Sequence, residues 1–375
     1  MQKIWTNSGD SHFLEPEDLW TSRLPKALAD LTPKSTKDPD GEYETVTVDG
    51  QTFRRKLPTS AAVSFLEQTR KAVGIRDAKA RLDDLNAEGV WGEVIFPSLG
   101  MWSSTFRTPE LLTACMRASN EWALEEVASV SERYVVTAQV STLRVQDAVS
   151  ELEWAAESGF QAVFLPTTPH PSAPDWHRPD WEPFWDAAER ARIVLAFHIG
   201  TDPVDVTAGG AGVVYRGPGG AVMNYAETTF SGQRAAMKLV ASGALDRHPD
   251  LKVLISEGGA TWIPFLGDRM LEGYRQHAMV VRPKLERDPK ETLMTQVYAS
   301  FQHDESAVAA HDAMGYKNVM FGSDYPHMEG TFGHTQETLK TLFDGASDAT
   351  RERITKGAFA ELFPKVPTAP ADGEI

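Results

Sequence analysis

Acidic and histidine residues end several of the apolar, strand-like segments of this chain. Asp10 and His12 end the first segment, His198 ends a later one, Glu257 follows the run VLIS, and Asp324 follows the run NVMFGS. Carboxylate and imidazole groups bind divalent metal ions, and the same groups transfer protons. We therefore expect a metal-dependent catalytic centre if the fold brings these segment ends together.

Two further histidines extend this set. His303 follows the segment VYASFQ, and His327 lies three residues after Asp324. A single histidine at a strand end is more often a buried hydrogen-bonding group than a metal ligand. Chance would not be expected to place such residues at the same end of five different strands, so a metal centre explains them better than separate structural roles.

Eight short β-branched or aliphatic segments must position these residues. They alternate with longer segments whose apolar residues have helical spacing, which predicts an α/β fold with parallel strands. An open doubly wound sheet alternates in the same way, but the polar residues at the C-terminal ends of most strands favour a closed (β/α)8 TIM barrel. The predicted strands are residues 6–12, 90–98, 134–141, 160–167, 193–200, 252–259, 297–304 and 318–327.

Two segments predict crossover helices, and three regions depart from a bare barrel. The helices are TPELLTACMRASNEWALEEVAS, which opens on a Thr-Pro start signal, and RVQDAVSELEWAAESG, which ends on a glycine cap. We assign residues 1–366 to one barrel domain with an inserted β-hairpin at about 42–56, around an Asp-Gly turn. The glycine-rich stretch 201–230 predicts a long lid loop, with an ordinary flexible loop as the alternative, and 367–375 a disordered tail.

Composition limits the partners that we expect. A formal net charge of −16 argues against binding to nucleic acid or to an anionic membrane surface. Cys115 is the only cysteine, so neither an intrachain disulfide nor a cysteine metal site can form. The sequence lacks a signal-like N-terminus and an apolar run of about 20 residues. We expect a cytoplasmic protein with a small-molecule substrate, and no nucleic acid or membrane partner.

The chain resembles the amidohydrolase-related family of the amidohydrolase superfamily, which includes aminocarboxymuconate semialdehyde decarboxylase and related carboxy-lyases and hydrolases. The resemblance covers nearly the whole chain and rests on GDSHFLEPEDLW, RLDDLNAEGVWGEVIFPS, FHIGT, HPDLKVLISEGGATWIPF and NVMFGSDYPHMEGTF. It implies that Asp10, His12, His198 and Asp324 are the metal ligands. It also implies a homodimer, because dimers are common in the family.

Two positions depart from the family pattern. Asp10 replaces the first histidine of a His-x-His pair, and Glu257 replaces a histidine that acts on substrate. We expect Zn²⁺, and Mn²⁺ is the alternative because two carboxylates and two imidazoles make a harder site than three imidazoles and one carboxylate. Residues 166–168 contain no lysine that could be carboxylated, as in two-metal members, so one divalent ion is expected.

The expected proton-transfer residues are Asp324, Glu257, His303 and His327, and Glu257 is either a base or an additional ligand. Glu15 is interpreted as the first-turn acid of a helix opened by Pro16, with metal contact left open. Aromatic residues near the predicted mouth suggest a hydrophobic or aromatic substrate, although they are equally compatible with an ordinary core. They are Trp20, Phe96, Trp102, Tyr225, Trp262, Phe301 and Tyr325.

Three functions are compatible with this site. The first is hydrolysis of a small carbonyl compound by a metal-activated water. The alternative is nonoxidative decarboxylation of an aromatic or unsaturated acid, which needs a proton donor near the metal. We predict hydrolysis, because Glu257 replaces the expected donor. The third is a catalytically silent barrel that only binds ligands, and metal analysis of protein purified without chelator would distinguish it from both enzymes.

Overall fold

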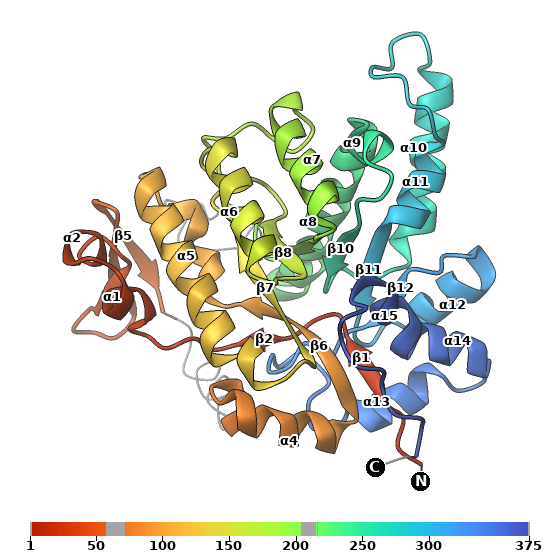
Figure 1. Ribbon diagram of the computed structural model, residues 1–375, viewed down its shortest axis with the longest axis horizontal. Coiled ribbons are helices and arrows are strands. Elements are labelled where there is room, and N and C mark those ends of the chain that lie inside the picture. Colours follow the sequence, from red (N-terminus) through yellow and green to blue (C-terminus); the bar gives the residue numbers. More distant parts are fainter. Residues whose placement is uncertain (1, 58–71, 204–214, 216, 374–375) are drawn as a thin grey trace.

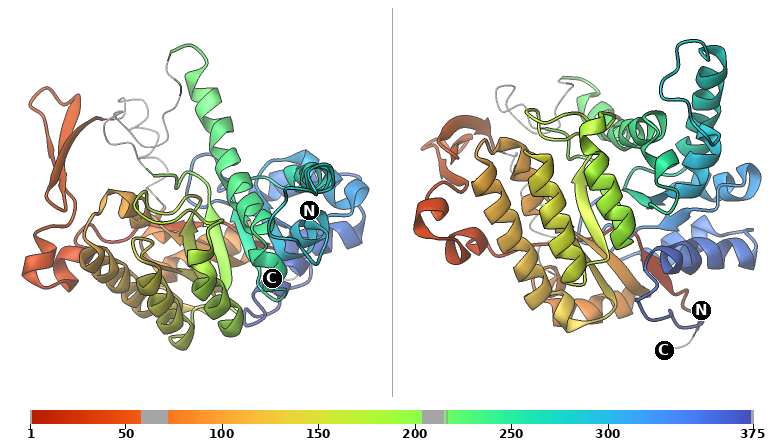
Figure 2. Two further views of the ribbon diagram at one scale, coloured as in Figure 1. Left: turned by 90° about the horizontal axis from the view of Figure 1, so that it is seen from above. Right: turned by 45° about the horizontal axis from the view of Figure 1, so that its top comes forward.

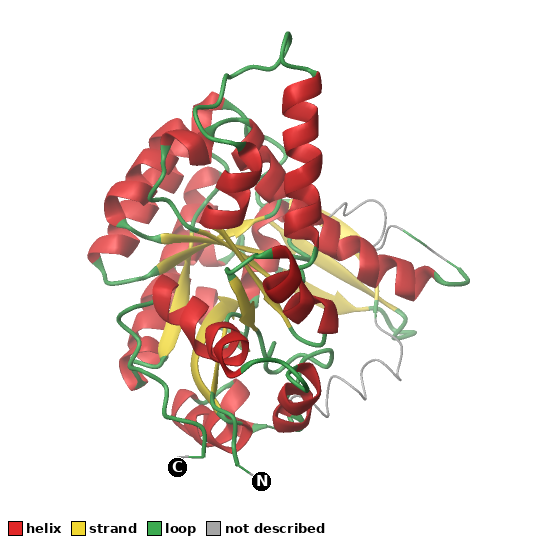
Figure 3. Cartoon of the chain, turned by 90° about the vertical axis from the view of Figure 1, so that its right-hand side faces the viewer, coloured by secondary structure: helices red, strands yellow, loops and turns green. Residues whose placement is uncertain are grey.

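The computed structural model describes residues 2–57, 72–203, 215 and 217–373. Helices surround a central ring of parallel strands (Figure 3). The ring runs β1-β6-β7-β8-β9-β10-β11-β12, and β2 pairs with β6 beyond the end of β1. The strands are β1 (Thr6–Ser8), β2 (His12–Phe13), β6 (Val90–Pro97), β7 (Tyr134–Gln139), β8 (Ala162–Pro166), β9 (Val194–His198), β10 (Val253–Ser256), β11 (Val297–Phe301) and β12 (Val319–Phe321).

Contacts between the first and last strands close the ring. The backbone N–H of Asp324 donates to the carbonyl of Asp10 at 2.9 Å, and that of His12 donates to the carbonyl of Tyr325. A Cβ on Gly322 would lie 2.9 Å from the Cβ of Asp10, so the missing side chain lets the two strands approach closely. The predicted TIM barrel and its eight strands are confirmed.

Helices cover the outside of the ring (Figure 1). Both predicted crossover helices are present, since α5 begins with proline after Thr108 and α6 is followed by Gly159 at φ +98°. No helix in the described ranges is long and apolar enough to cross a membrane. The helices are α1 (Leu19–Arg23), α2 (Lys26–Ala29), α4 (Ala78–Glu88), α5 (Pro109–Glu126), α6 (Val145–Glu157), α7 (Glu182–Ala191), α8 (Gly220–Ala241), α9 (Ala244–Arg247), α10 (Trp262–Gln276), α11 (Pro289–Gln296), α12 (Glu305–Met314), α13 (Thr335–Leu342), α14 (Asp348–Glu352) and α15 (Ala358–Leu362).

Two layers of buried apolar side chains stabilise the barrel. The inner layer fills the ring with buried side chains that alternate along the strands, among them Phe96, Phe164, Leu254, Tyr298 and Met320. The outer layer lies between the strands and the helices. Successive residues of a strand face opposite layers. The residue two positions after each inner-layer residue therefore also points into the barrel, one step nearer its mouth. The candidate ligands occupy this mouth layer.

The inserted hairpin is present, and it carries a third strand that the sequence pattern did not reveal. Strands β4 (Tyr43–Val48) and β5 (Gln51–Lys56) are antiparallel around Asp49-Gly50, and β3 (Lys34–Lys37) pairs with β4. The Asp49 carboxylate accepts hydrogen bonds from the backbone N–H groups of Arg107 and Thr108, both at 2.6 Å. These bonds fix the small sheet beside the start of α5 (Figure 1).

The glycine-rich segment is partly helical instead of a loop. Residues 204–214 and 216 lie outside the described residues. From Gly220 onward the chain forms α8, which starts after Gly219 in the left-handed conformation, φ +79°. Residues 221–230 contain no proline or further glycine, and one face of the helix buries Ala235 and Leu239. The predicted loop therefore ends earlier than residue 230, and its role as a lid stays a prediction.

The tail that we expected to be disordered, 367–375, makes ordered contacts as far as Gly373. Trp91 donates from Nε1 to the carbonyl of Pro367 at 2.8 Å, and Lys356 lies 3.1 Å from the Asp372 carboxylate. The backbone N–H of Trp5 also donates to Asp372, at 3.1 Å. These contacts hold the two ends of the chain side by side (Figure 1), which differs from the expectation of disorder. Residues 374 and 375 lie outside the described part.

Candidate metal centre

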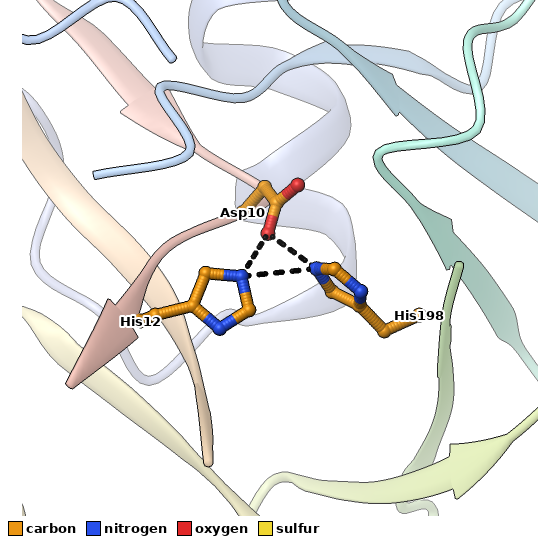
Figure 4. A group of neighbouring side chains, drawn as sticks. All are labelled: Asp10, His12 and His198. Carbon is orange, nitrogen blue, oxygen red and sulfur yellow. Dashed lines mark hydrogen bonds and ion pairs between the residues drawn. The ribbon is translucent and has the colours of Figure 1, made fainter. Parts of the chain in front are cut away.

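Asp10, His12 and His198 meet inside the barrel, where Asp10 follows β1, His12 begins β2 and His198 ends β9 (Figure 4). The Nε2 atoms of the two histidines are 3.1 Å apart, and Oδ1 of Asp10 is 3.2 Å from Nε2 of His198 and 3.7 Å from Nε2 of His12. Oδ1 of Asp324 lies 3.4 Å from Nε2 of His12. The structure therefore brings together all four predicted metal ligands.

One hydrogen bond fixes the orientation of His198. Its Nδ1 lies 2.8 Å from the carbonyl oxygen of Ile199, and because a carbonyl can only accept, Nδ1 donates. The lone pair of a neutral imidazole is then on Nε2, which faces Nε2 of His12. Two facing nitrogen atoms at this distance need a proton or a cation between them.

The buried carboxylates favour a cation. Asp10 and Asp324 are both fully buried, and Oδ2 of each has no hydrogen-bond partner among the described residues. A buried ionised oxygen without a partner is costly, and a divalent ion bound by both carboxylates would remove that cost. Two carboxylate oxygens and two imidazole nitrogens suit Zn²⁺ or Mn²⁺. The donor set thus fits a divalent metal ion.

Buried serine hydroxyl groups support the ends of the strands. Ser8 donates from Oγ to the carbonyl of Asp10 at 2.6 Å, and Ser256 donates to the carbonyl of Gly9 at 2.7 Å. Oγ of Ser300 accepts from the backbone N–H of Glu257 at 3.0 Å. These small inward side chains provide hydrogen-bond partners for backbone groups at the place where the hydrogen bonds between the barrel strands end.

Two site residues have strained backbones. Asp324 has φ +52° and Glu257 has φ +62°, the left-handed region that non-glycine residues seldom occupy. Such conformations cost roughly 1 kcal/mol or more and occur at functional sites, where they point a side chain in a direction that regular structure does not permit. Here an oxygen of each carboxylate lies within 4.8 Å of an oxygen of the exposed Glu329.

The titration behaviour of the site follows from burial and from its carboxylates. Burial by itself lowers the pKa of His198, but the Asp10 and Glu257 carboxylates outweigh it and raise the pKa to about 10. Burial and the neighbouring His327 and His198 keep the pKa of His12 well below its ordinary value. Protonation of His198 and binding of a cation are alternatives, because both use Nε2.

Glu257 lies beside this group. Its Oε2 is 3.6 Å from Nε2 of His198, and its side chain is only 11% exposed. Burial raises its pKa to about 8, against the opposing effect of His198. This position is compatible with both predicted roles, a proton-transfer group beside the metal and an additional ligand.

The two predicted catalytic histidines lie in different places. Nδ1 of His327 is 2.9 Å from Oδ1 of Asp324, and its ring stacks on His12 with 4.1 Å between centroids. Burial lowers the pKa of His327, but contact with Asp324 raises it to about 9. His303 instead contacts the carbonyl of Glu329 at 3.0 Å and stacks on His334, and none of its described contacts is with the four ligands.

The Glu15 carboxylate accepts hydrogen bonds from backbone N–H groups, and its described partners do not include the predicted metal ligands. Its carboxylate accepts from the N–H groups of Ser98 and Leu99 at 3.0 and 3.3 Å, and burial raises its pKa to about 7. Glu15 therefore caps the turn that follows β6. The interpretation as a first-turn acid is wrong in detail, because no helix begins at Pro16 and α1 starts at Leu19.

The aromatic residues that were expected near the mouth divide into three groups. The Phe96 ring contacts His198 edge-on with 4.8 Å between centroids, and the pKa of Tyr225 is raised to about 12 by burial and by Glu257. Trp20, Phe301 and Tyr325 are buried core residues, as is Phe96. The remaining two, Trp102 and Trp262, pack against the outer core.

Glu329 was missed by the sequence reasoning. Oxygens of Glu257, Asp324 and Glu329 lie within 4.8 Å of one another, so Glu329 adds a third carboxylate at the mouth. It lies two residues beyond His327, in the segment SDYPHMEGTF. Extending the search for acidic residues past the end of the last strand would have found it.

Comparison with known proteins agrees with this arrangement. A family model described as Amidohydrolase matches residues 97–365. The decarboxylase macB of Penicillium terrestre is 26% identical over 187 residues, which cover 49% of this chain and 53% of that protein. The chain thus aligns with about half the length of this curated relative.

Solved structures share the fold. An amidohydrolase from Mycobacterium avium subsp. paratuberculosis superposes with a TM-score of 0.77 at 19% identity, covering 96% of this chain and 99% of that one. The 5-carboxyvanillate decarboxylase of Sphingomonas paucimobilis gives 0.69 at 18% identity, with 96% and 99% coverage. A second 5-carboxyvanillate decarboxylase, from Novosphingobium aromaticivorans, contains manganese and gives 0.67 at 15% identity, with 96% and 97% coverage. Since the family model spans most of the barrel, this chain belongs to the amidohydrolase family.

Proposed function

We propose that this enzyme is a metal-dependent, nonoxidative decarboxylase of an aromatic or unsaturated carboxylic acid. Hydrolysis, the first of the two predicted reactions, has less support, because the curated relative and two of the three compared structures are named as decarboxylases. The observation that carries the proposal is the contact between His327 and Asp324 at the edge of the candidate metal centre. It favours His327, one of the predicted proton-transfer residues, as the proton donor that decarboxylation needs.

Asp10, His12, His198 and Asp324 would hold the divalent ion. When bound, the ion supplies a Lewis acid for the carboxylate and a neighbouring hydroxyl oxygen of the substrate. Zn²⁺ and Mn²⁺ both suit these ligands, and the manganese in one compared decarboxylase favours Mn²⁺.

The proton that replaces the carboxylate comes, in this proposal, from His327. Nδ1 of the imidazolium is held by Asp324, which leaves Nε2 to give its proton to the carbon as the carbon–carbon bond breaks and CO₂ leaves. His327 is 42% exposed in its side chain, so bulk water can reprotonate it. His303 is a poorer candidate because its described contacts lie outside the ligand group.

Glu257 is the group best placed to accept a proton from a hydroxyl of the substrate. It is mostly buried, lies 3.6 Å from His198, and is not needed to complete the four ligands. A carboxylate in that position would keep the substrate hydroxyl ionised or strongly hydrogen-bonded while His327 acts on carbon. Glu257 and His327 thereby take opposite proton-transfer roles.

The test is a substrate screen with protein loaded with Mn²⁺ or Zn²⁺. Hydroxybenzoic acids and unsaturated acids form one panel, and esters, lactones and thioesters form the other. Detection of CO₂, with deuterium from D₂O at the vacated carbon, is the expected result. Hydrolysis products from the second panel with no CO₂ from the first would overturn the proposal in favour of hydrolysis.

A homodimer is also proposed, and α8 supplies the supporting observation. Val222, Met223, Phe230 and Met237 are 75%, 41%, 45% and 38% exposed and lie on one side of the helix, which extends from the barrel in Figure 2. Light scattering at micromolar concentration should give a dimer, and Phe230→Asp should dissociate it. Met279→Asp, at a residue 91% exposed beyond α10, is the control and should not. A monomeric wild-type protein would contradict this assembly.

A further inference from the structure

A buried ion pair lies directly outside the candidate metal centre. Arg81 on α4 and Glu93 on β6 both have fully buried side chains, and their fork-like contact includes an Nη2–Oε2 distance of 2.9 Å. Removing two charges from water costs about as much as their attraction returns, so such a pair is weak evidence for stability. Its role depends on what else the guanidinium contacts.

The guanidinium of Arg81 contacts two chain segments that carry predicted metal ligands, one after the first barrel strand and one after the last. Nη1 donates to the carbonyl of His12 at 2.9 Å. The same guanidinium stacks on the ring of Tyr325, 4.4 Å from its centroid, and Tyr325 directly follows Asp324. Arg81 thus bridges the backbone of one ligand and the neighbour of another.

The surroundings leave this bridge little room to move. Oη of Tyr325 donates to the Asp84 carboxylate at 2.7 Å, so α4 also holds the outer end of the Tyr325 ring. A Cβ on Gly74 would lie 2.3 Å from that carboxylate and 2.7 Å from Cα of Arg81. Only glycine permits so close a packing of the chain against the pair.

We propose that Arg81 is a positioning residue of the metal centre, which sets the separation of His12 and Asp324 through the His12 carbonyl and the Tyr325 ring. The inference rests on the proposed metal site. It also gives a role to the segment RLDDLNAEGVWGEV, which contains Arg81, Asp84 and Glu93 but no predicted ligand. Groups that orient metal ligands typically change metal affinity by 10- to 100-fold when removed.

The main test is the double variant Arg81→Met/Glu93→Leu, which removes both charges and leaves no unpaired buried ion. The readouts are thermal unfolding and the dissociation constant for Mn²⁺, measured from free Mn²⁺ by electron paramagnetic resonance. We expect a folded protein that binds Mn²⁺ roughly 10- to 100-fold more weakly. The spectrum of the bound ion should also change, because the ligand geometry changes.

A second arginine–glutamate ion pair in the same protein serves as the matched control. Arg117 and Glu151 form a fork-like ion pair with contacts of 2.7 to 3.1 Å, and the Arg117 guanidinium stacks on Trp154 at 3.9 Å. Glu151 is buried, although Arg117 is partly exposed, and neither contacts a predicted ligand. Arg117→Met/Glu151→Leu should alter stability and leave Mn²⁺ affinity within about twofold of the wild type.

Two milder variants keep the proposal testable if the double variant does not fold. Arg81→Lys keeps the charge but cannot hold Glu93, the His12 carbonyl and the Tyr325 ring together, and Tyr325→Phe removes only the bond to Asp84. We expect about a tenfold loss of Mn²⁺ affinity for the first and a smaller loss for the second. Wild-type affinity in every folded variant would overturn the inference, whereas wild-type affinity in His198→Ala would instead overturn the metal site itself.

Discussion

Two histidine–carboxylate clusters lie at opposite ends of this barrel, and they differ in one respect. The mouth holds His12 and His198 with Asp10 and Asp324, at the carboxyl ends of their strands. The other end holds His248, which precedes β10 and contacts Glu189 at 2.9 Å and Glu182 at 3.1 Å. Residue types alone would identify both as candidate metal sites.

The hydrogen bonds of the second cluster, however, are complete. Glu182 also forms a contact of 2.7 Å with Arg247, and Glu189 accepts from the backbone N–H of Asp250 at 3.0 Å. Both ring nitrogens of His248 have carboxylate partners. At the mouth, Oδ2 of Asp10 and of Asp324 have none among the described residues. Unpartnered buried oxygens, more than the kind of side chain, distinguish a site for a cation from a structural cluster.

The largest expected effect follows from removing one histidine from each cluster. His198→Ala should lose most bound metal and all measurable activity, because Nε2 of His198 is a predicted ligand, while the barrel stays folded. His248→Ala should keep its metal and activity and lose about 1–3 kcal/mol of stability, because two half-buried carboxylates lose a partner. Metal analysis, activity assays and urea unfolding of both variants provide the measurements.

Equal metal content in the two variants would remove the distinction between the clusters. If His198→Ala retained full occupancy, the assignment of the mouth as the metal centre would be wrong. If His248→Ala lost metal, the second cluster would have to be a binding site despite its complete hydrogen bonding.

A smaller effect is expected at Glu257. As a proton-transfer group, Glu257→Gln should retain metal and lower turnover by roughly a hundredfold, the usual size of a general acid/base contribution. As a ligand, it should bind metal more weakly, and added metal should restore much of the rate. Glu189→Gln, in the second cluster, is the matched control and should change neither quantity. Unchanged turnover and metal content in Glu257→Gln would exclude both roles.

The sequence was sufficient to predict the features that depend on strand periodicity. All eight strands, both tested crossover helices and the hairpin at Asp49-Gly50 are in the expected places, because local patterns of apolar residues and turns determine them. Asp10, His12, His198 and Asp324 could be grouped because the carboxyl ends of parallel barrel strands meet at one end.

Features that depend on packing between distant segments could not be predicted. The start of α8 at Gly220 was hidden by the glycines before it, and the contact of His303, a predicted proton-transfer residue, with the Glu329 carbonyl depends on the position of another loop. The pairing of Arg81 with Glu93 and with the His12 carbonyl needs three segments to be in place. Nothing in a local pattern predicts the partner of a buried charge.

The smallest expected effect concerns Glu15, whose hydrogen bonding is intermediate between that of the two clusters. Its buried carboxylate has hydrogen-bond partners, but they are the neutral backbone N–H groups of Ser98 and Leu99, and no cation among the described residues contacts it. Neutral donors offset only part of the cost of burying a charge, so burial raises the pKa of Glu15 to about 7 from its ordinary value of 4.5. The stability of the fold should therefore depend on the protonation of this one group.

The sign of that dependence follows from the raised pKa. The folded protein keeps the Glu15 proton between about pH 4.5 and 7, where the unfolded chain has lost it, so the stabilisation is fully present below pH 4.5 and is lost as the pH rises to about 7. The shift corresponds to about 3 kcal/mol at most. Glu15→Gln cannot ionise, so its urea midpoint should rise relative to that of the wild type as the pH increases from 4.5 to 7.5. A constant difference between the two midpoints over this range would mean that Glu15 does not titrate in the folded protein, and that backbone N–H groups hold a buried carboxylate as well as the ion pairs of the second cluster do.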